Sequence, residues 1–225
     1  MSEQGLTRRT VLRGTALGIL GAATMFDSYD RGGPLVFVGE YSAIANVGGL
    51  PTGLLGNSIG EAAFMTGLER NSDVVLMSSY APLYANYNHT QWNPDLIGYD
   101  QLSSFGSTSY WVQRLFAGSV GDKVLPVTAT DTGLYYSATV DSRSGQVYLK
   151  IVNPAAQAVA IQVAFGGRND QAAGIEVLAD PDPQAGNTLT SPDAVVPSRG
   201  ALRGSSGFFT YQVPANSLTV MRVAR

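Results

Sequence analysis

The sequence predicts an α/β part followed by an all-β part: βα units of the kind that build a (β/α)₈ barrel, and then an antiparallel β-sandwich. Residues 34–118 alternate apolar runs of strand length with stretches of helical spacing. Beyond Lys123 the pattern changes to short alternating strands separated by turn residues. Only 14% of residues are charged, whereas average proteins have roughly 25%, and 26 residues are Gly. This composition favours short strands and tight loops.

The first residues have the layout of an export signal. Arg8 and Arg9 stand directly before a weakly apolar run from Gly14 to Ala23, as in twin-arginine signals. We therefore expect residues 1–24 to be a twin-arginine-type signal segment and the protein to be secreted or held at the cell surface. A basic N-terminus without a signal function is the alternative. An apolar run of about ten residues is half of the roughly 20 that span a bilayer, which argues against a stable membrane anchor.

The first βα unit is predicted from Leu35 to Glu69. The run Leu35–Val38 reads as a parallel strand buried on both faces, and it ends at Glu40. After a Gly-rich loop, Ser58 and Glu61 have the spacing of a capping box, which predicts a helix start there and gives Glu61 a structural role. Glu69 is interpreted as a solvated carboxylate on that helix.

The second βα unit follows in the same order. Asp73–Met77 predicts another buried strand, and a long polar and aromatic loop comes next, from Tyr84 to Pro94. The helix expected over Ser107–Ala117 puts Val112, Leu115 and Phe116 on its inner face. In a (β/α)₈ barrel, loops that follow the strands build the active site, which draws attention to Glu40 and to the 84–94 loop.

The boundary between the two parts is placed near residue 122, with a partial (β/α)₈ barrel over 25–122 and a β-sandwich over 123–225. Residues 141–145 join a predicted hairpin, and residues 180–207 form a Pro- and Gly-rich excursion partly outside the sheets. The predicted strands of this part are 134–140, 146–152, 158–165, 175–179, 208–213 and 218–223.

Composition excludes several functions. A net charge of −3 gives no basic surface for nucleic acid. The absence of Cys and the single His leave no thiol nucleophile and no Cys- or His-based metal site, and no nucleotide motif is present, so we expect neither metal nor cofactor. Catalysis or ligand binding would then depend on carboxylates, hydroxyls and aromatic rings.

Several uninterrupted stretches after residue 24 closely resemble one enzyme family. They are MFDSYDRGGPLVFVGEYSA, IGEAAFMTGLERNSDVVLMSSYAPLYAN, WNPDLIGYDQ and STSYWVQRLF, and, at the end of the chain, FFTYQVPANSLTVMRV. The first four resemble the end of the catalytic barrel of family 51 α-L-arabinofuranosidases, and the last resembles the final strands of their C-terminal β-sandwich. The resemblance implies the last two βα units of a (β/α)₈ barrel.

The resemblance also implies an activity, namely retaining hydrolysis that removes terminal α-L-arabinofuranosyl groups from arabinose-containing polysaccharides. The family nucleophile aligns with Glu40 in VFVGEY. Retaining hydrolysis needs two carboxyl groups roughly 5–5.5 Å apart, and a carboxylate fixed at a strand end suits the attacking role. Tyr41, Tyr80 and Asn86 either bind sugar hydroxyls, orient Glu40 or pack in the core, and Trp92 either stacks on a sugar ring or packs.

The sequence departs from the family in one respect. The family's general acid/base is a Glu in an Asn-Glu pair, and no Asn-Glu pair occurs in this sequence; its first six barrel strands have no counterpart either. We therefore expect a truncated form that is inactive alone, with strand edges open to self-association. Two alternatives stay open: a noncatalytic polysaccharide-binding or structural β-sandwich with a vestigial barrel fragment, and a different glycosidase on a related barrel.

Overall fold

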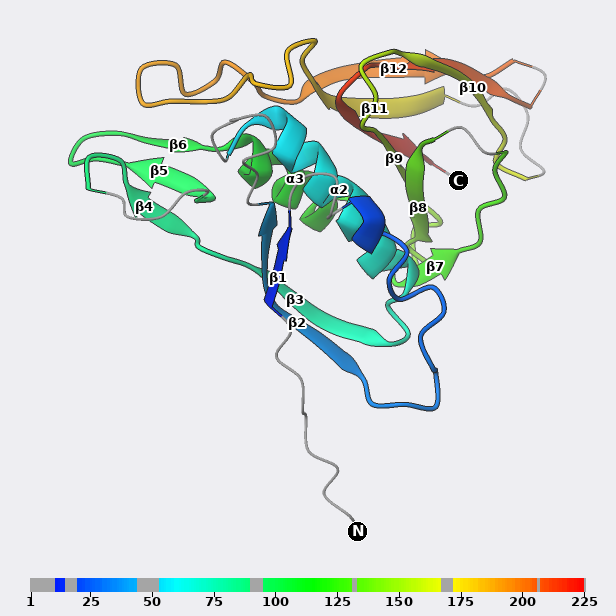
Figure 1. Cartoon of the computed structure of the whole chain (residues 1–225). Helices are drawn as coiled ribbons and strands as arrows, with labels where there is room; N and C mark the ends of the chain where they lie inside the picture. Colours follow the sequence, from blue (N-terminus) through cyan, green and yellow to red (C-terminus); the bar gives the residue numbers. More distant parts are fainter. Residues whose placement is uncertain are drawn as a thin grey trace.

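The computed structural model describes residues 11–14, 20–43, 53–89, 95–130, 133–166, 172–205 and 207–224. It is mostly sheet, with two long helices at its centre (Figure 1). The elements are β1 (Val11–Gly14), β2 (Val36–Ala43), α2 (Leu55–Arg70), β3 (Val75–Tyr80), β4 (Tyr84–Asn86), β5 (Ile97–Tyr99), β6 (Ser104–Gly106), α3 (Thr108–Ala117), β7 (Lys123–Leu125), β8 (Tyr135–Val140), β9 (Val147–Asn153), β10 (Val159–Val163), β11 (Ala172–Ala179), β12 (Ser198–Arg203), β13 (Phe209–Val213) and β14 (Ser217–Val223).

The predicted order of strand, helix, strand and helix is confirmed in β2, α2, β3 and α3, although the small β4–β5–β6 sheet intervenes before α3. β2 pairs in parallel with β3 on one side and with β1 on the other. Phe64 and Leu68 of α2 pack against β2 and β3 in one core cluster. A parallel pair joined by a crossover helix is the βα arrangement that the sequence predicts.

The prediction that both faces of these strands are buried is wrong. Val38 and Val75 face α2 and are buried, whereas Phe37 and Met77 are 40% and 62% exposed. The layer that would cover this second face is not supplied by the described residues, so an apolar strip of Leu35, Phe37, Leu76 and Met77 lies open to solvent.

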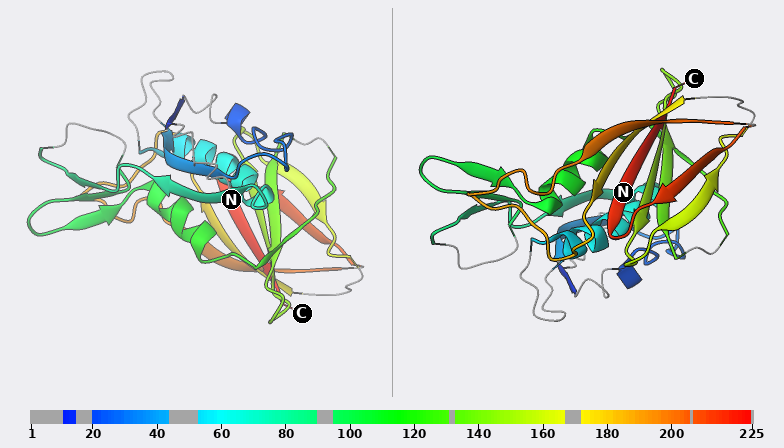
Figure 2. Two further views of the ribbon diagram at one scale, coloured as in Figure 1. Left: turned by 90° about the horizontal axis from the view of Figure 1, so that it is seen from below. Right: turned by 90° about the horizontal axis from the view of Figure 1, so that it is seen from above.

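The second part contains a six-stranded sheet in the order β12-β11-β14-β9-β8-β7 and a two-stranded β10–β13 sheet. Its β8–β9 hairpin is confirmed, with Tyr135 opposite Val152 and Val140 opposite Val147. One face of the large sheet shares a core cluster with β10 and β13, through Ile151, Met221 and Val213. The other face shares a cluster with α2 and α3. Figure 2 shows the helices lying against this sheet. Residues on both sides of the boundary predicted near residue 122 therefore share one core.

Helix α2 corrects the capping-box prediction. The helix begins at Leu55 rather than Ser58, and no side chain caps it. Instead, the N–H groups of Leu55 and Gly56 donate to the carbonyls of Ala185 and Pro183, at 2.9 and 2.8 Å. Because the 180–207 excursion satisfies these helix-end donors, no local capping residue is needed.

Helix α3, in contrast, begins where the sequence predicts. Ser107 is the N-cap, and its Oγ accepts a hydrogen bond from the N–H of Tyr110 at 3.2 Å. Val112, Leu115 and Phe116 are buried against the large sheet, as predicted.

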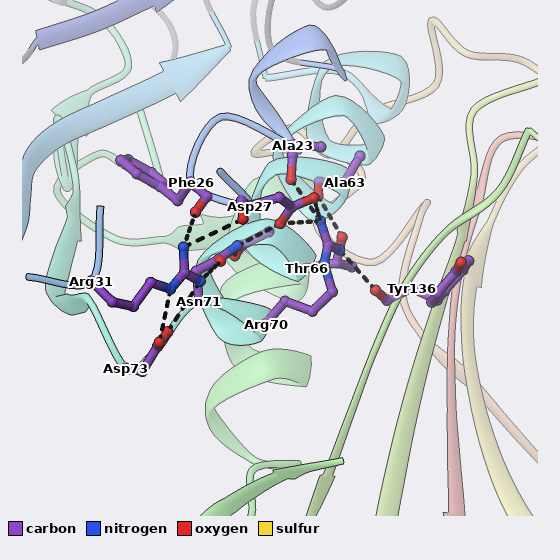
Figure 3. A network of polar contacts seen from close by, with 11 residues as sticks. Ala23, Phe26, Asp27, Arg31, Ala63, Thr66, Arg70, Asn71, Asp73 and Tyr136 are labelled. Carbon is purple, nitrogen blue, oxygen red and sulfur yellow. Dashed lines mark hydrogen bonds and ion pairs between the residues drawn. The ribbon is translucent and has the colours of Figure 1, made fainter. Parts of the chain in front are cut away.

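Residues 20–31 are bound to the end of α2 by a network of polar contacts (Figure 3). Arg70 donates to the Ala23 carbonyl at 3.0 Å, to the carboxylate of Asp27, and to the Tyr136 carbonyl on β8. Arg31 donates to the side chain of Asn71 at 2.6 Å. Ala23 is fully buried, so the end of the segment predicted as a signal packs into the fold here.

Glu69 is also corrected, because it is not a solvated carboxylate. Lys150 of β9, whose side chain is 0% exposed, donates to Glu69 Oε1 at 2.5 Å, and Ser137 of β8 donates to Oε2. Burial lowers the pKa of Lys150, and the neighbouring Glu69 opposes that shift. This ion pair joins α2 to the large sheet.

Gly67 lies where α2 touches the N-terminal segment. A Cβ at this position would stand 2.0 Å from the carbonyl oxygen of Ala23, whereas a Cβ at Gly21 would meet nothing within 4 Å. We expect Gly67→Ala to lower the free energy of unfolding by about 1–3 kcal/mol through overpacking, despite the better helix propensity of Ala. Chemical denaturation measures this, with Gly21→Ala as the matched control. Equal stability of the two variants would contradict the contact.

Candidate active site

Glu40 lies on β2, three residues before the strand ends at Ala43, and it is half-buried. The register between β2 and β3 shifts between Val38 and Tyr41, so Glu40 stands within an irregular stretch of the ladder. The carbonyl of the preceding residue, Gly39, accepts a hydrogen bond from Ser79 Oγ. Bulges near strand ends re-aim side chains and recur next to active sites.

Tyr41 and Tyr80 lie together in the core behind this stretch. Tyr41 is 3% exposed and Tyr80 is 6% exposed, and their ring centroids are 5.9 Å apart in an edge-to-face arrangement. The Tyr41 hydroxyl exchanges hydrogen bonds with the amide of Gln113 on α3, at 2.9–3.0 Å. Burial raises the pKa of both phenols. Of the roles considered from sequence, packing behind Glu40 is the one that these contacts support.

Asn86 is not in this group. It lies on β4, in the small β4–β5–β6 sheet that extends away from the helices (Figure 1), and its Oδ1 accepts a hydrogen bond from the N–H of Asn88 at 3.2 Å. Trp92 lies outside the described residues. The sugar-binding roles of these two residues stay predictions.

Glu61 is a buried ionisable group that the sequence did not predict. It is 0% exposed on the face of α2 that packs against β2 and β3. Its Oε1 accepts a hydrogen bond from the backbone N–H of Ala43 at 2.8 Å, and its Oε2 has no hydrogen-bond partner. The nearby hydroxyls of Ser109 and Tyr80 favour the ionised form, but that of Tyr80 makes no hydrogen bond.

Burial dominates the electrostatics of this carboxyl and raises the pKa of Glu61 to about 7. A signal was present in the sequence, because Glu61 precedes Phe64 and Leu68 by three and seven residues and so shares their helix face. A carboxylate on the apolar stripe of a helix is a candidate for a shifted pKa.

We expect this carboxyl to make stability depend on pH. Since the pKa of Glu61 is raised in the folded state from 4.5 to about 7, its contribution is complete below pH 4.5 and is lost as pH rises through 7. The difference in unfolding free energy between the wild type and Glu61→Gln should fall by about 3 kcal/mol between pH 4.5 and 8. Urea denaturation at a series of pH values measures it. A difference that stays constant over this range would refute the shift.

A separate pocket of about 360 Å³ lies between the end of α3 and the edge of the large sheet. Among its lining residues, Glu176 forms ion pairs with Arg222 and Arg199, each at 2.9 Å. Arg114 lies over the ring of Trp111, with its guanidinium carbon 4.9 Å from the centroid. An aromatic ring beside several charged side chains is suited to a polar organic ligand.

The described part of the chain contains no group of three or more His, Asp or Glu arranged to hold a metal ion. Within the same residues, neither helix is long and apolar enough to cross a bilayer.

The chain has clear relatives. Residues 40–217 match the model of the "Alpha-L-arabinofuranosidase C-terminal domain". "Alpha-L-arabinofuranosidase A" of Aspergillus kawachii is 40% identical over 208 residues, which make up 91% of this chain and 32% of that protein. An "Extracellular exo-alpha-L-arabinofuranosidase" of Streptomyces chartreusis is 52% identical over 107 residues, or 48% of this chain and 12% of that protein.

Solved structures of α-L-arabinofuranosidases also superimpose on this chain. An arabinose-bound GH51 α-L-arabinofuranosidase superimposes with a TM-score of 0.88 and 37% identity, covering 96% of this chain and 36% of that one. The arabinose complex of the Thermotoga maritima enzyme has a TM-score of 0.72, covers 93% of this chain and 47% of that one, and shares the fold at 16% identity. The chain spans about a third of the length of the Aspergillus relatives and less of the Streptomyces relative.

Proposed function

This chain belongs to the family of α-L-arabinofuranosidase C-terminal domains, whose model matches residues 40–217, and we propose that it forms the C-terminal part of a retaining α-L-arabinofuranosidase. In this proposal β2, α2, β3 and α3 are the last two βα units of a (β/α)₈ barrel. The observation that carries the proposal is Glu40, a carboxylate near the C-terminal end of a strand that is parallel to its neighbour and joined to it by a helix.

Glu40 acts as the nucleophile. Its carboxylate attacks the anomeric carbon of a terminal α-L-arabinofuranosyl group and forms a covalent glycosyl-enzyme, which water then hydrolyses with net retention. A second carboxyl group must protonate the leaving oxygen. Because the chain has no Asn-Glu pair and spans about a third of its relatives, we infer that this acid lies in a segment that the chain does not span.

The exposed strip of Leu35, Phe37, Leu76 and Met77 supports the barrel assignment, since the inner face of barrel strands is packed with apolar side chains. We further propose secretion by the twin-arginine route, supported by Arg8 and Arg9 before the apolar run and by a Streptomyces relative named as extracellular. Arabinose-containing polysaccharides are the proposed substrates, as the names of the relatives suggest.

A noncatalytic polysaccharide-binding role is the second candidate, and the pocket at Trp111 and Arg114 is the observation that favours it. Aromatic rings bind the apolar faces of sugars. Under this alternative, the chain would retain arabinan without releasing arabinose.

A chimera tests the proposal. Residues 25–225 of this chain replace the corresponding C-terminal third of the Aspergillus kawachii relative, which is 40% identical over the aligned region. We expect the chimera to release arabinose from arabino-oligosaccharides, whose leaving group needs a proton, whereas the 225-residue chain alone shows background release, since general acid catalysis and positioning by the other barrel loops are both lost. A folded but inactive chimera would contradict the proposal, and sugar binding by the chain alone would then favour the second candidate.

A further inference from the structure

Glu61 is a buried ionisable group for which the proposed mechanism has no use. It is 0% exposed, although ionisable side chains are almost never fully buried unless they are paired, and its Oε2 lacks a hydrogen-bond partner. A buried polar atom without a partner costs about 1–3 kcal/mol, so the arrangement is expensive if it serves stability alone.

The bond that Glu61 does make reaches the strand of the proposed nucleophile. Its Oε1 accepts from the N–H of Ala43 at 2.8 Å, and Ala43 is the last residue of β2. Ala43 and Glu40 are three residues apart on one extended strand, a span of about 10 Å. Helix α2 thus adds a side-chain acceptor at the carboxyl end of β2, where the backbone also pairs with β1.

The ladder between β2 and β3 is irregular at Glu40, whereas the ladder between β2 and β1 is regular there. The β2–β3 register is interrupted between Val38 and Tyr41, and the carbonyl of Tyr41 accepts only a long bond of 3.3 Å from the N–H of Ala81. Beyond this interruption, the Glu61–Ala43 bond and the Tyr41–Gln113 pair hold the strand on the helix side, in addition to its pairing with β1. Without the former, the end of β2 would keep its packing against α2 but lose its hydrogen bond to that helix.

The titratable groups that face Glu61 are phenols, beside the hydroxyl of Ser109. Tyr41 of β2 and Tyr80 of β3 both interact electrostatically with its carboxylate, and Tyr80 also experiences the charge of Asp95. With both phenols neutral, Glu61 is the group here that titrates near neutral pH. An ionised carboxylate accepts a stronger hydrogen bond than a protonated carboxyl, so the two protonation states of Glu61 hold the N–H of Ala43 with different strength.

We propose that Glu61 is a positioning residue, which fixes the C-terminal end of β2 through the N–H of Ala43 and thereby sets the orientation of Glu40. The inference rests on the proposed role of Glu40 as nucleophile.

The test uses the 225-residue chain, with ¹³C-labelled Glu and ¹⁵N-labelled backbone, observed by NMR. In Glu61→Leu, which removes the acceptor, we expect amide exchange at Ala43 to rise at least about tenfold and the Glu40 carboxyl signal to move. Glu61→Gln, which keeps an acceptor, should retain both. Asp73→Asn is the control, because Asp73 lies ahead of β3 in an exposed ion pair with Arg31, and should leave both signals in place.

If Glu61→Leu does not fold, a pH titration of the wild type and of Glu61→Gln, followed by NMR, tests the positioning role. In the wild type, the Ala43 amide and the Glu40 carboxyl signals should share an inflection near pH 7, which Glu61→Gln removes. The proposal is overturned if this inflection is absent, if it persists in Glu61→Gln, or if a folded Glu61→Leu leaves the Glu40 signal unmoved.

The chimera separates this inference from the proposed function. There, Glu61→Leu should lower kcat at least about tenfold with KM changed less than about twofold, and Glu61→Gln should restore most of the rate. An inactive chimera together with the expected NMR result would refute the function and leave the positioning intact. Full activity of Glu61→Leu would refute the positioning alone.

Discussion

Glu40→Ala in the chimera is expected to abolish release of arabinose, lowering kcat by on the order of 10⁴-fold or more, because the covalent route depends on this carboxylate. The measurement is initial-rate kinetics with 4-nitrophenyl α-L-arabinofuranoside. Asp73→Asn is the control, since this carboxylate lies ahead of β3, at the opposite end of the strands, in an exposed ion pair with Arg31. Surface pairs of this kind contribute little, so its activity should match that of the parent.

Azide distinguishes loss of the nucleophile from loss of the fold. In Glu40→Ala, azide enters the space left by the carboxylate and attacks the anomeric carbon opposite the leaving group. The C–O bond to nitrophenolate breaks as the C–N bond forms, and nitrophenolate leaves without needing a proton. The product is the inverted glycosyl azide, identifiable by NMR. Full activity of Glu40→Ala, or a retained azide product, would refute the assignment of Glu40.

Lys150→Met is expected to have the largest effect on stability. It leaves Glu69, whose side chain is 11% exposed, without its cation between α2 and β9. Breaking a buried ion pair by removing one partner typically costs 3–5 kcal/mol, which for a chain of this length lowers Tm by about 10 °C. Calorimetry measures the change. The double variant Lys150→Met, Glu69→Leu should recover much of the loss, because an apolar pair replaces the charged one.

The control for this pair is Arg199→Met. Arg199 also bonds a carboxylate, Glu176, but its side chain is 79% exposed and Arg222 remains to pair with Glu176. We expect a change within about 1 kcal/mol. If Lys150→Met is as mild as Arg199→Met, the buried pair does not contribute as described.

Local signals explain which elements could be predicted. The strands of the second part show period-two alternation, and Ser107 is a capping residue directly before α3, so neither depends on distant chain. The start of α2 could not be found this way, because the carbonyls that satisfy its first N–H groups come from Pro183 and Ala185, more than 120 residues away.

The residues of the candidate site could be picked out from the sequence only in part, for the same reason. Glu40 follows an apolar run of strand length, and this pattern is visible in the neighbouring residues alone. The role of Glu61 depends on which backbone group faces it, and that is decided when β2 docks on α2. A capping-box spacing matched by chance gave Ser58 and Glu61 a local explanation, whereas Ser58 in fact bonds Thr108 and Ser109 on α3.

The buried contact between Glu69 and Lys150 also bears on synthesis of the chain. The two residues are 81 positions apart, so at roughly 5–20 residues per second the ribosome needs about 4–16 s to deliver Lys150 after Glu69 has emerged. Throughout this interval the sheet-facing side of α2 has neither its cation nor the apolar strands β9 and β14 to cover it. Nascent chains of this protein should therefore depend on holding chaperones until β9 is complete, and slow codons between these two positions should lower its soluble yield.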